Sequence, residues 1–161
     1  MQFIHQDIAK VIANILHETG LEAKYLELEI TETTVMDDVE HAISTLKDIQ
    51  SMGVEIALDD FGTGYTSIGH LKQFPISTLK IDQSFIKNLP ESNDDTAIVS
   101  AVVAMAHNLG LKVVAEGVET EAHLHYLADI RCDMIQGYYF SRPLPETEAV
   151  SLLKSAAINI V

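Results

Sequence analysis

The chain has few basic residues, a single cysteine and no tryptophan. Its 161 residues include 10 lysines and arginines against 24 aspartates and glutamates, which gives a formal net charge of -14. Binding of long nucleic acid through its phosphates requires a basic face, so we expect no such partner. A lone Cys132 excludes a disulfide framework and is typical of a reducing compartment. We therefore expect a cytoplasmic protein.

Long apolar runs are also missing. No stretch reaches the roughly 20 residues of a membrane-spanning helix, and residues 1–12 lack a basic region followed by an apolar run. We therefore expect no membrane segment in this chain. However, 47% of the residues are hydrophobic, which excludes a disordered chain. At this length the expectation is one domain that buries a real core.

Apolar residues recur at helical spacing in four segments. They predict helices at about 3–18, 37–52, 94–109 and 146–155. In the third helix, the stripe predicted to face the core consists of Ile98, Val102, Met105 and Leu109. Three helices are followed by a glycine, which accepts the left-handed turn that closes a helix. These glycines are Gly20, Gly53 and Gly110.

Short apolar runs alternate with these helices. They predict strands near 26–30, 54–58, 78–81, 112–115, 133–136 and 138–140. Alternating strands and helices build a parallel sheet with helical crossovers, so the fold class is α/β. Six strands are too few for a closed eight-stranded barrel, which needs roughly 250 residues. An open doubly wound sheet and an incomplete barrel both remain possible on this pattern.

Two adjacent carboxylates, Asp59 and Asp60, follow the apolar run 54–58 and precede the glycine-containing segment 61–65. Carboxylates at the end of a buried strand repel each other and lose hydration, which they tolerate poorly without a cation. A divalent-metal site is therefore the first hypothesis. An acid pair in a solvated surface loop is the alternative, with about equal weight for the motif alone.

Further acids, one lysine and one glutamine lie at or just after the ends of the other predicted strands. The carboxyl ends of parallel strands share one edge of a sheet, so these residues are expected to converge in space. They are Glu29, Glu32, Lys80, Asp82, Glu116, Glu119 and Gln136. Taken singly, Lys80 or Asp82 would be a solvated charge and Gln136-Gly137 a turn. The ordered set points to one shared site.

Together, five segments resemble the EAL domain family, the bacterial cyclic-di-GMP phosphodiesterases. They are 28–32 (LEITE), 59–65 (DDFGTGY), 79–82 (LKID), 114–120 (VAEGVET) and 136–144 (QGYYFSRPL). The resemblance extends over about residues 1–155. It implies a partial TIM-like (β/α)8 barrel with its active site at the carboxyl ends of the strands. The whole chain, 1–161, is then the C-terminal part of one EAL domain.

The resemblance also implies a two-metal site for Mg²⁺ or Mn²⁺ that hydrolyses cyclic-di-GMP to linear pGpG. Glu29 and Asp59 correspond to metal ligands, and Asp60 to a ligand of the second metal. Lys80 corresponds to the residue that positions and polarises the attacking water. Glu116 corresponds to the general base. Two hard cations and a proton acceptor are what phosphodiester hydrolysis requires.

Supporting roles follow from the same resemblance. Glu119 corresponds to a nearby metal or water ligand and Gln136 to an orienting partner. Glu32 corresponds to the glutamate that steadies the loop from Gly62 to Thr66. The residues implied at the border of the guanine pocket are Arg142 and Pro143.

Two of the family's motifs do not occur in this chain. The first is the glutamate-alanine-leucine motif of the first strand, whose glutamate binds metal. The second is the metal-binding asparagine that ends the next strand. The chain begins at Met1-Gln2-Phe3, which resembles a segment beyond both motifs. The resemblance therefore implies that the first two strands are lacking and that hydrolysis by this chain is impaired.

Two other readings remain. One is a noncatalytic EAL-like module that binds cyclic-di-GMP or a protein partner. The other is a phosphoacceptor receiver domain, which also uses paired acids and a lysine at strand ends. There the acid pair ends the first strand and the lysine lies much later, whereas Lys80 follows Asp59 by one strand. Glu116 and Glu119 have no counterpart in a receiver.

We expect self-association of the chain, as a homodimer or a larger assembly. Without their neighbours, the strand at 26–30 and the final strand keep unpaired edges that favour pairing between copies. Small residues in the helix at 94–109, namely Ala101, Ala104 and Ala106, are compatible with a close helix contact. Light scattering on the purified chain tests this, and a strictly monomeric species contradicts it.

Overall fold

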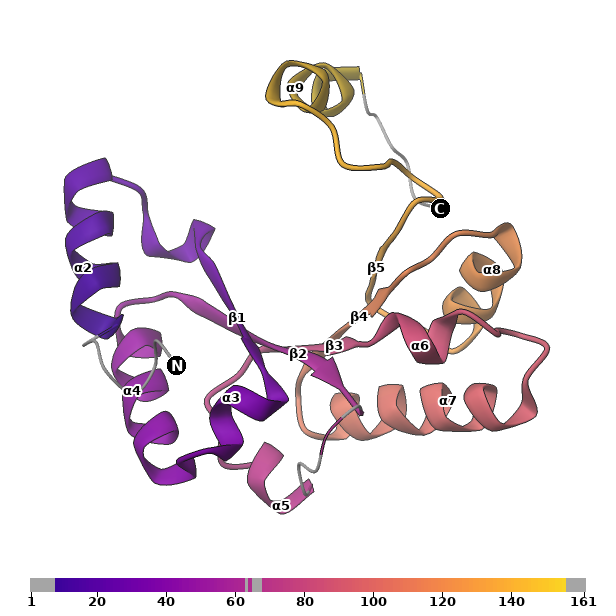
Figure 1. The fold of residues 1–161 in the computed structure, drawn as a ribbon, viewed down its shortest axis with the longest axis horizontal. Coiled ribbons are helices and arrows are strands. Elements are labelled where there is room, and N and C mark those ends of the chain that lie inside the picture. Colours follow the sequence, from indigo (N-terminus) through magenta and orange to yellow (C-terminus); the bar gives the residue numbers. More distant parts are fainter. Residues whose placement is uncertain (1–7, 63, 65–67, 156–161) are drawn as a thin grey trace.

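Five parallel strands form one sheet in the computed structural model, which describes residues 8–62, 64 and 68–155. Their order in space follows the sequence, as Figure 1 shows. The strands are β1 (Glu27–Thr31), β2 (Glu55–Phe61), β3 (Thr78–Ile81), β4 (Lys112–Glu116) and β5 (Met134–Gln136). A doubly wound sheet reverses its order at a switch point, whereas a barrel wall does not. The fold is therefore a partial TIM-like barrel, as expected.

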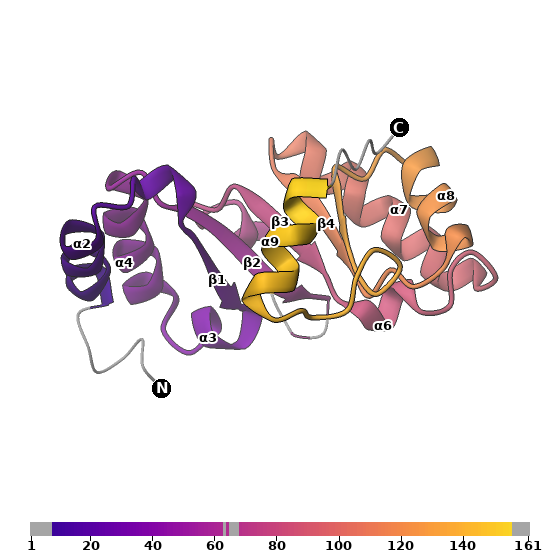
Figure 2. The same ribbon diagram turned by 90° about the horizontal axis from the view of Figure 1, so that it is seen from above.

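Helices connect the strands. They are α2 (Ile8–Thr19), η1 (Ala23–Tyr25), α3 (Glu32–Met36), α4 (Val39–Ser51), α5 (Ile68–Leu71), α6 (Gln83–Ile86), α7 (Asn93–Asn108), α8 (Glu121–Asp129) and α9 (Glu146–Ser155). In Figures 1 and 2, α4 and α7 lie on one side of the sheet and α9 lies on the other. No helix in the described part of the chain is long and apolar enough to cross a membrane.

The two faces of the sheet differ in character because side chains alternate along each strand. The register pairs Ile30 with Leu58, Leu58 with Leu79 and Leu79 with Val113, all buried in the core. The opposite face carries polar residues at the positions between. These include Glu29, Asp59, Lys80, Glu116 and Gln136. The core therefore packs on one face, and the chemistry-bearing side chains gather on the other.

The helix ends and most element bounds match the sequence patterns. Gly20, Gly53 and Gly110 have φ values of 69°, 91° and 76°, in the left-handed region expected of them. The stripe expected in α7 was partly wrong. Its fully buried residues are Val99, Val103 and Ala106, while Ile98 is exposed. Burial of Ala106 also removes it from the residues available for a helix contact between copies.

The sixth strand expected at 138–140 is absent, because these residues form a turn. The Tyr139 N–H donates to the Val118 carbonyl at 2.9 Å, and the Phe140 N–H donates to the Gly137 carbonyl at 3.2 Å. A Cβ on Gly137 would lie 2.1 Å from the Val118 carbonyl oxygen. This close approach holds the chain against the turn after β4 and ends the strand.

Asp133 joins three elements at the amino-terminal edge of the sheet. Its Oδ2 lies 2.8 Å from His107 Nε2 at the end of α7 and accepts from the Val113 N–H at 2.8 Å. Burial alone would raise the pKa of Asp133, but the hydrogen bonds from His107 and Val113 outweigh it and lower that pKa. Asp133 therefore fixes the start of β5 against β4 and α7.

Replacing Asp133 with alanine is expected to destabilise the fold by about 1–2 kcal/mol, because the buried Val113 N–H loses its acceptor. The lowered pKa means that this contribution is complete above the unfolded-state pKa of about 3.9 and is lost as the pH falls through the folded-state value. Urea unfolding of D133A and wild type at pH 7 and at pH 3 measures both effects. Asp48→Ala on the exposed face of α4 is the control. A gap between D133A and wild type that is unchanged at pH 3 contradicts this assignment.

Candidate active site

Lys80 lies on β3 with its side chain only 5% exposed and is surrounded by carboxylates. Its Nζ lies 2.8 Å from Glu29 Oε1, 2.8 Å from Glu116 Oε1 and 3.3 Å from Asp59 Oδ1. These acids come from β1, β4 and β2 respectively. The predicted convergence of Glu29, Asp59, Lys80 and Glu116 is therefore confirmed as geometry.

The ammonium group of Lys80 remains charged in this environment. Burial lowers the pKa of a lysine, but the hydrogen bonds to Glu116 and Glu29 and the negative charge of Asp59 outweigh burial and raise it. Lys80 is thus a fixed positive charge across the physiological range. It cannot serve as a proton acceptor there.

Asp59, Asp60 and Glu116 each offer a carboxylate oxygen, and these oxygens all lie within 4.8 Å of one another. The Asp60 N–H donates to Asp59 Oδ1 at 3.0 Å, and Asp60 has a φ of 56°, rare for a residue with a side chain. Burial, followed by the charges of Asp59 and Asp82, raises the pKa of Asp60. The left-handed backbone at Asp60, near the end of β2, thus directs a second carboxylate to the cluster at an electrostatic cost.

The charges of the cluster fit divalent cations. Four carboxylates, those of Glu29, Asp59, Asp60 and Glu116, against one ammonium leave three negative charges in excess. Carboxylate oxygens are the ligands that Mg²⁺ and Mn²⁺ prefer. Among the described residues, the carboxylates of Glu29 and Glu119 do not belong to the group that Asp59, Asp60 and Glu116 form. Glu29 contacts Lys80 instead.

Glu32 opens α3 and is buried, with 3% exposed. Its Oε2 accepts from the Gly64 N–H at 3.2 Å and from the Gly62 N–H at 3.4 Å. A Cβ on Gly64 would lie 2.8 Å from Glu32 Cδ, so a side chain there would displace the Glu32 carboxyl group. The glutamate therefore contacts the loop that follows the acid pair. Thr63 and 65–67 in this loop, including Thr66, lie outside the described residues.

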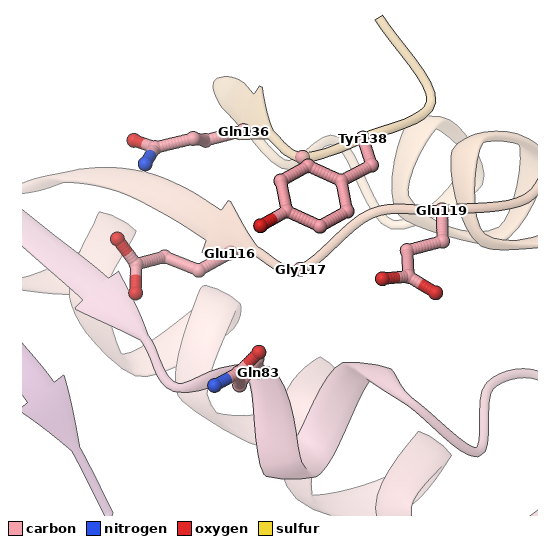
Figure 3. A pocket seen from close by; sticks show the side chains of 7 residues that line it. Gln83, Glu116, Gly117, Glu119, Gln136 and Tyr138 are labelled. Atoms are coloured by element: carbon pink, nitrogen blue, oxygen red, sulfur yellow. The ribbon is translucent and has the colours of Figure 1, made fainter. Parts of the chain in front are cut away.

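Beside the cluster is a hollow of about 210 Å³. Figure 3 shows Gln136 and Tyr138 on one side of Gly117 and Gln83 on the other, with Glu119 on the far side from Glu116. Gly117 has a φ of 72°, and a Cβ there would lie 2.5 Å from Gln83 Cβ. The lining residues are Gln83, Glu116, Gly117, Glu119, Gln136, Gly137 and Tyr138.

Sequence reasoning missed Gln83 and Tyr138. A glutamine that opens a short helix has no distinguishing pattern, although its place directly after 79–82 was a usable signal. Arg142 and Pro143 are both exposed, and neither is among the described residues that line this hollow. Arg142 instead places its guanidinium carbon 4.6 Å from the centre of the Tyr138 ring. This contact ties the segment after β5 to the rim of the hollow.

Residues 1–143 match the model of a family described as the EAL domain. The chain belongs to the EAL domain family. Among curated relatives, it is 46% identical over 157 residues to the bifunctional diguanylate cyclase/cyclic di-GMP phosphodiesterase MucR of Pseudomonas aeruginosa. That alignment covers 98% of this chain and 22% of MucR. The chain spans only about a fifth of the curated relatives that it matches.

Solved EAL structures share the fold. A MucR phosphodiesterase complex with c-di-GMP superposes with a TM-score of 0.88 and 45% identity, covering 92% of this chain and 60% of that one. The EAL domain of Mycobacterium smegmatis DcpA gives a TM-score of 0.90 and 41% identity, covering 96% and 69%. A manganese/cy-diGMP complex of Klebsiella pneumoniae BlrP1 gives a TM-score of 0.80 and 33% identity, covering 88% of this chain and 36% of that one.

Replacing Lys80 with methionine is expected to destabilise the EAL fold by about 1–3 kcal/mol, because three carboxylates lose their common cation. Their partial exposure keeps the loss below that of a fully buried pair. The raised pKa of Lys80 means that its contribution is complete below the unfolded-state pKa of about 10.4 and is lost as the pH rises through the higher folded-state value.

The difference between K80M and wild type is therefore expected to be constant from pH 7 to pH 9 in urea unfolding. Lys72→Met, at an exposed position, is the matched control and is expected to change stability by less than about 0.5 kcal/mol. Equal effects of K80M and K72M would refute the central role of Lys80.

Proposed function

We propose that this EAL domain hydrolyses cyclic-di-GMP to linear pGpG at the Lys80 cluster. One observation carries the proposal. Carboxylate oxygens of Asp59, Asp60 and Glu116 lie within 4.8 Å of one another, beside the buried ammonium group of Lys80. The relatives named cyclic di-GMP phosphodiesterases and the neighbours in complex with c-di-GMP support the choice of substrate.

Asp59, Asp60 and Glu29 are the proposed holders of two divalent cations, Mg²⁺ or Mn²⁺. When bound, such cations neutralise the phosphodiester and make water acidic enough to lose a proton near neutral pH. The excess of carboxylates in the cluster and the manganese in the BlrP1 complex support this assignment. Burial and then the charges of Asp59 and Asp82 raise the pKa of Asp60, and a cation there would relieve that repulsion.

Glu116 is the proposed general base. Its carboxylate lies at the end of β4, between the acid pair and the hollow, so it can accept the proton of a water held there. Lys80 is the proposed positioning group. Its 2.8 Å contact with Glu116 orients that carboxylate. Its positive charge also favours the anionic phosphodiester at the mouth of the strands.

The remaining roles are proposed from their places in the fold. Gln136 pairs with Glu116 in the register of β5 with β4 and orients the substrate or water beside it. Glu32 steadies the loop after the acid pair. Glu119 borders the hollow as a water or substrate ligand. The residues proposed to border a guanine base through the segment after β5 are Arg142 and Pro143.

A noncatalytic domain that binds cyclic-di-GMP is the second candidate, because Glu29 and Glu119 lie outside the carboxylate group of the described residues. Impaired turnover, homodimerisation and a cytoplasmic location also stay proposals for this chain. Calorimetry with cyclic-di-GMP, with and without Mn²⁺, separates the two functions. Binding that is indifferent to Mn²⁺, without hydrolysis, favours the noncatalytic domain.

Asp60→Asn is expected to weaken Mn²⁺ binding by at least about tenfold, because it removes one carboxylate from the group of three. Glu116→Gln is expected to lower hydrolysis by about a hundredfold or more through loss of the proton acceptor. Titration calorimetry gives the first result and chromatography of pGpG the second. Asp48→Asn and Glu121→Gln, both at exposed positions, are the controls. Unchanged Mn²⁺ affinity in D60N counts against the proposed site.

A further inference from the structure

The hollow beside Glu116 continues into a larger one. The second hollow has a volume of about 730 Å³ and shares Gln83, Gly117 and Glu119 with the first. The two therefore form one trough that begins at the carboxylate cluster and runs along α6.

The far part of the trough differs in charge from its beginning. It is lined by Ser84 of α6, by Lys87 directly after α6, and by Thr120 and His123 at the start of α8. Lys87 is the one lysine or arginine that lines either hollow within the described part of the chain. It is exposed and forms no ion pair with a described carboxylate. Its ammonium group is thus available to a ligand.

The proposed substrate needs a second cationic contact. Cyclic-di-GMP carries two phosphodiesters on opposite sides of its ring, so only one can lie at the carboxylate cluster at a time. The other remains an anion against a chain with a net charge of -14. An anion in such a field is unfavourable unless a local positive charge compensates. Lysine is a frequent point-charge partner of phosphate.

We infer that Lys87 binds the second phosphodiester of cyclic-di-GMP, the one that is not being cleaved. Ser84 and Thr120 line the same hollow and provide hydroxyl donors beside it. Glu119 lines the same hollow from the turn after β4 rather than from α6. Its negative charge repels a phosphate, so the phosphate is held on the side of Lys87. This inference rests on the proposed function and makes Lys87 a determinant of specificity for a cyclic dinucleotide.

The test compares two ligands that differ in one phosphate. Cyclic-di-GMP and guanylyl-(3′,5′)-guanosine both contain two guanosines, but the linear dinucleotide has a single phosphodiester. Equilibrium dialysis in Mn²⁺ buffer measures both affinities. Every variant and the reference protein carry Glu116→Gln, because that change is expected to slow hydrolysis, and chromatography checks that the ligand is recovered intact. Lys87→Ala is expected to weaken cyclic-di-GMP binding about tenfold, the effect of one charged hydrogen bond, and to leave the linear ligand unchanged.

Two further variants sharpen the result. Lys87→Arg is expected to restore most of the affinity for cyclic-di-GMP, and Lys72→Ala, exposed and outside the trough, to match the reference protein for both ligands. An equal loss for both ligands in K87A, or no loss for either, overturns the inference while the proposed function stands. If neither the reference protein nor wild type binds either ligand, the proposed function fails and this inference fails with it.

Discussion

Lys80 holds carboxylates from β1, β2 and β4 within 3.3 Å of one buried ammonium group. Burying such a group costs several kcal/mol of hydration, and apolar residues of similar volume commonly give a core of equal or greater stability. The cluster is therefore a poor device for stability alone. Its value lies in fixing the direction of three acids that repel one another. Without Lys80, these three acids would lose the positive charge that they share.

The alternation of the sheet makes this arrangement possible. Parallel strands in register place like positions on the same face, so Lys80 and the acids share one face while the opposite face packs into the core. Two glycines then allow the turns that follow β4 and β5 to approach neighbouring segments closely. Gly117 contacts the first turn of α6, and Gly137 packs on the backbone of Val118. Any side chain at either position would push apart the walls of the hollow beside Glu116.

Much of this could be read from the sequence, for reasons specific to particular residues. Short apolar runs predicted the five observed strands and a sixth that does not form, but the order of the strands stayed open until the resemblance to the EAL family implied a barrel. Acids at strand ends converge by the geometry of a parallel sheet. The turn at 138–140 could not be predicted, because it depends on the Val118 carbonyl and the space at Gly137. The core face of α7 was partly wrong because Ile98 and Val99 begin adjacent apolar rows, and only packing chooses between them. Gln83 offered only its place directly after 79–82 as a signal and Lys87 offered none, since their importance comes from α6 lying beside the turn after β4.

The central claim is that acids from separate strands share one cation site beside Lys80. Its most direct test is a crystal structure of the chain grown in Mn²⁺, with the metal located by anomalous scattering. The account predicts manganese bound to carboxylate oxygens of Asp59 and Asp60, with Lys80 still in contact with Glu116. Manganese bound away from these residues, or Asp59 and Glu116 on opposite sides of the sheet, would contradict it.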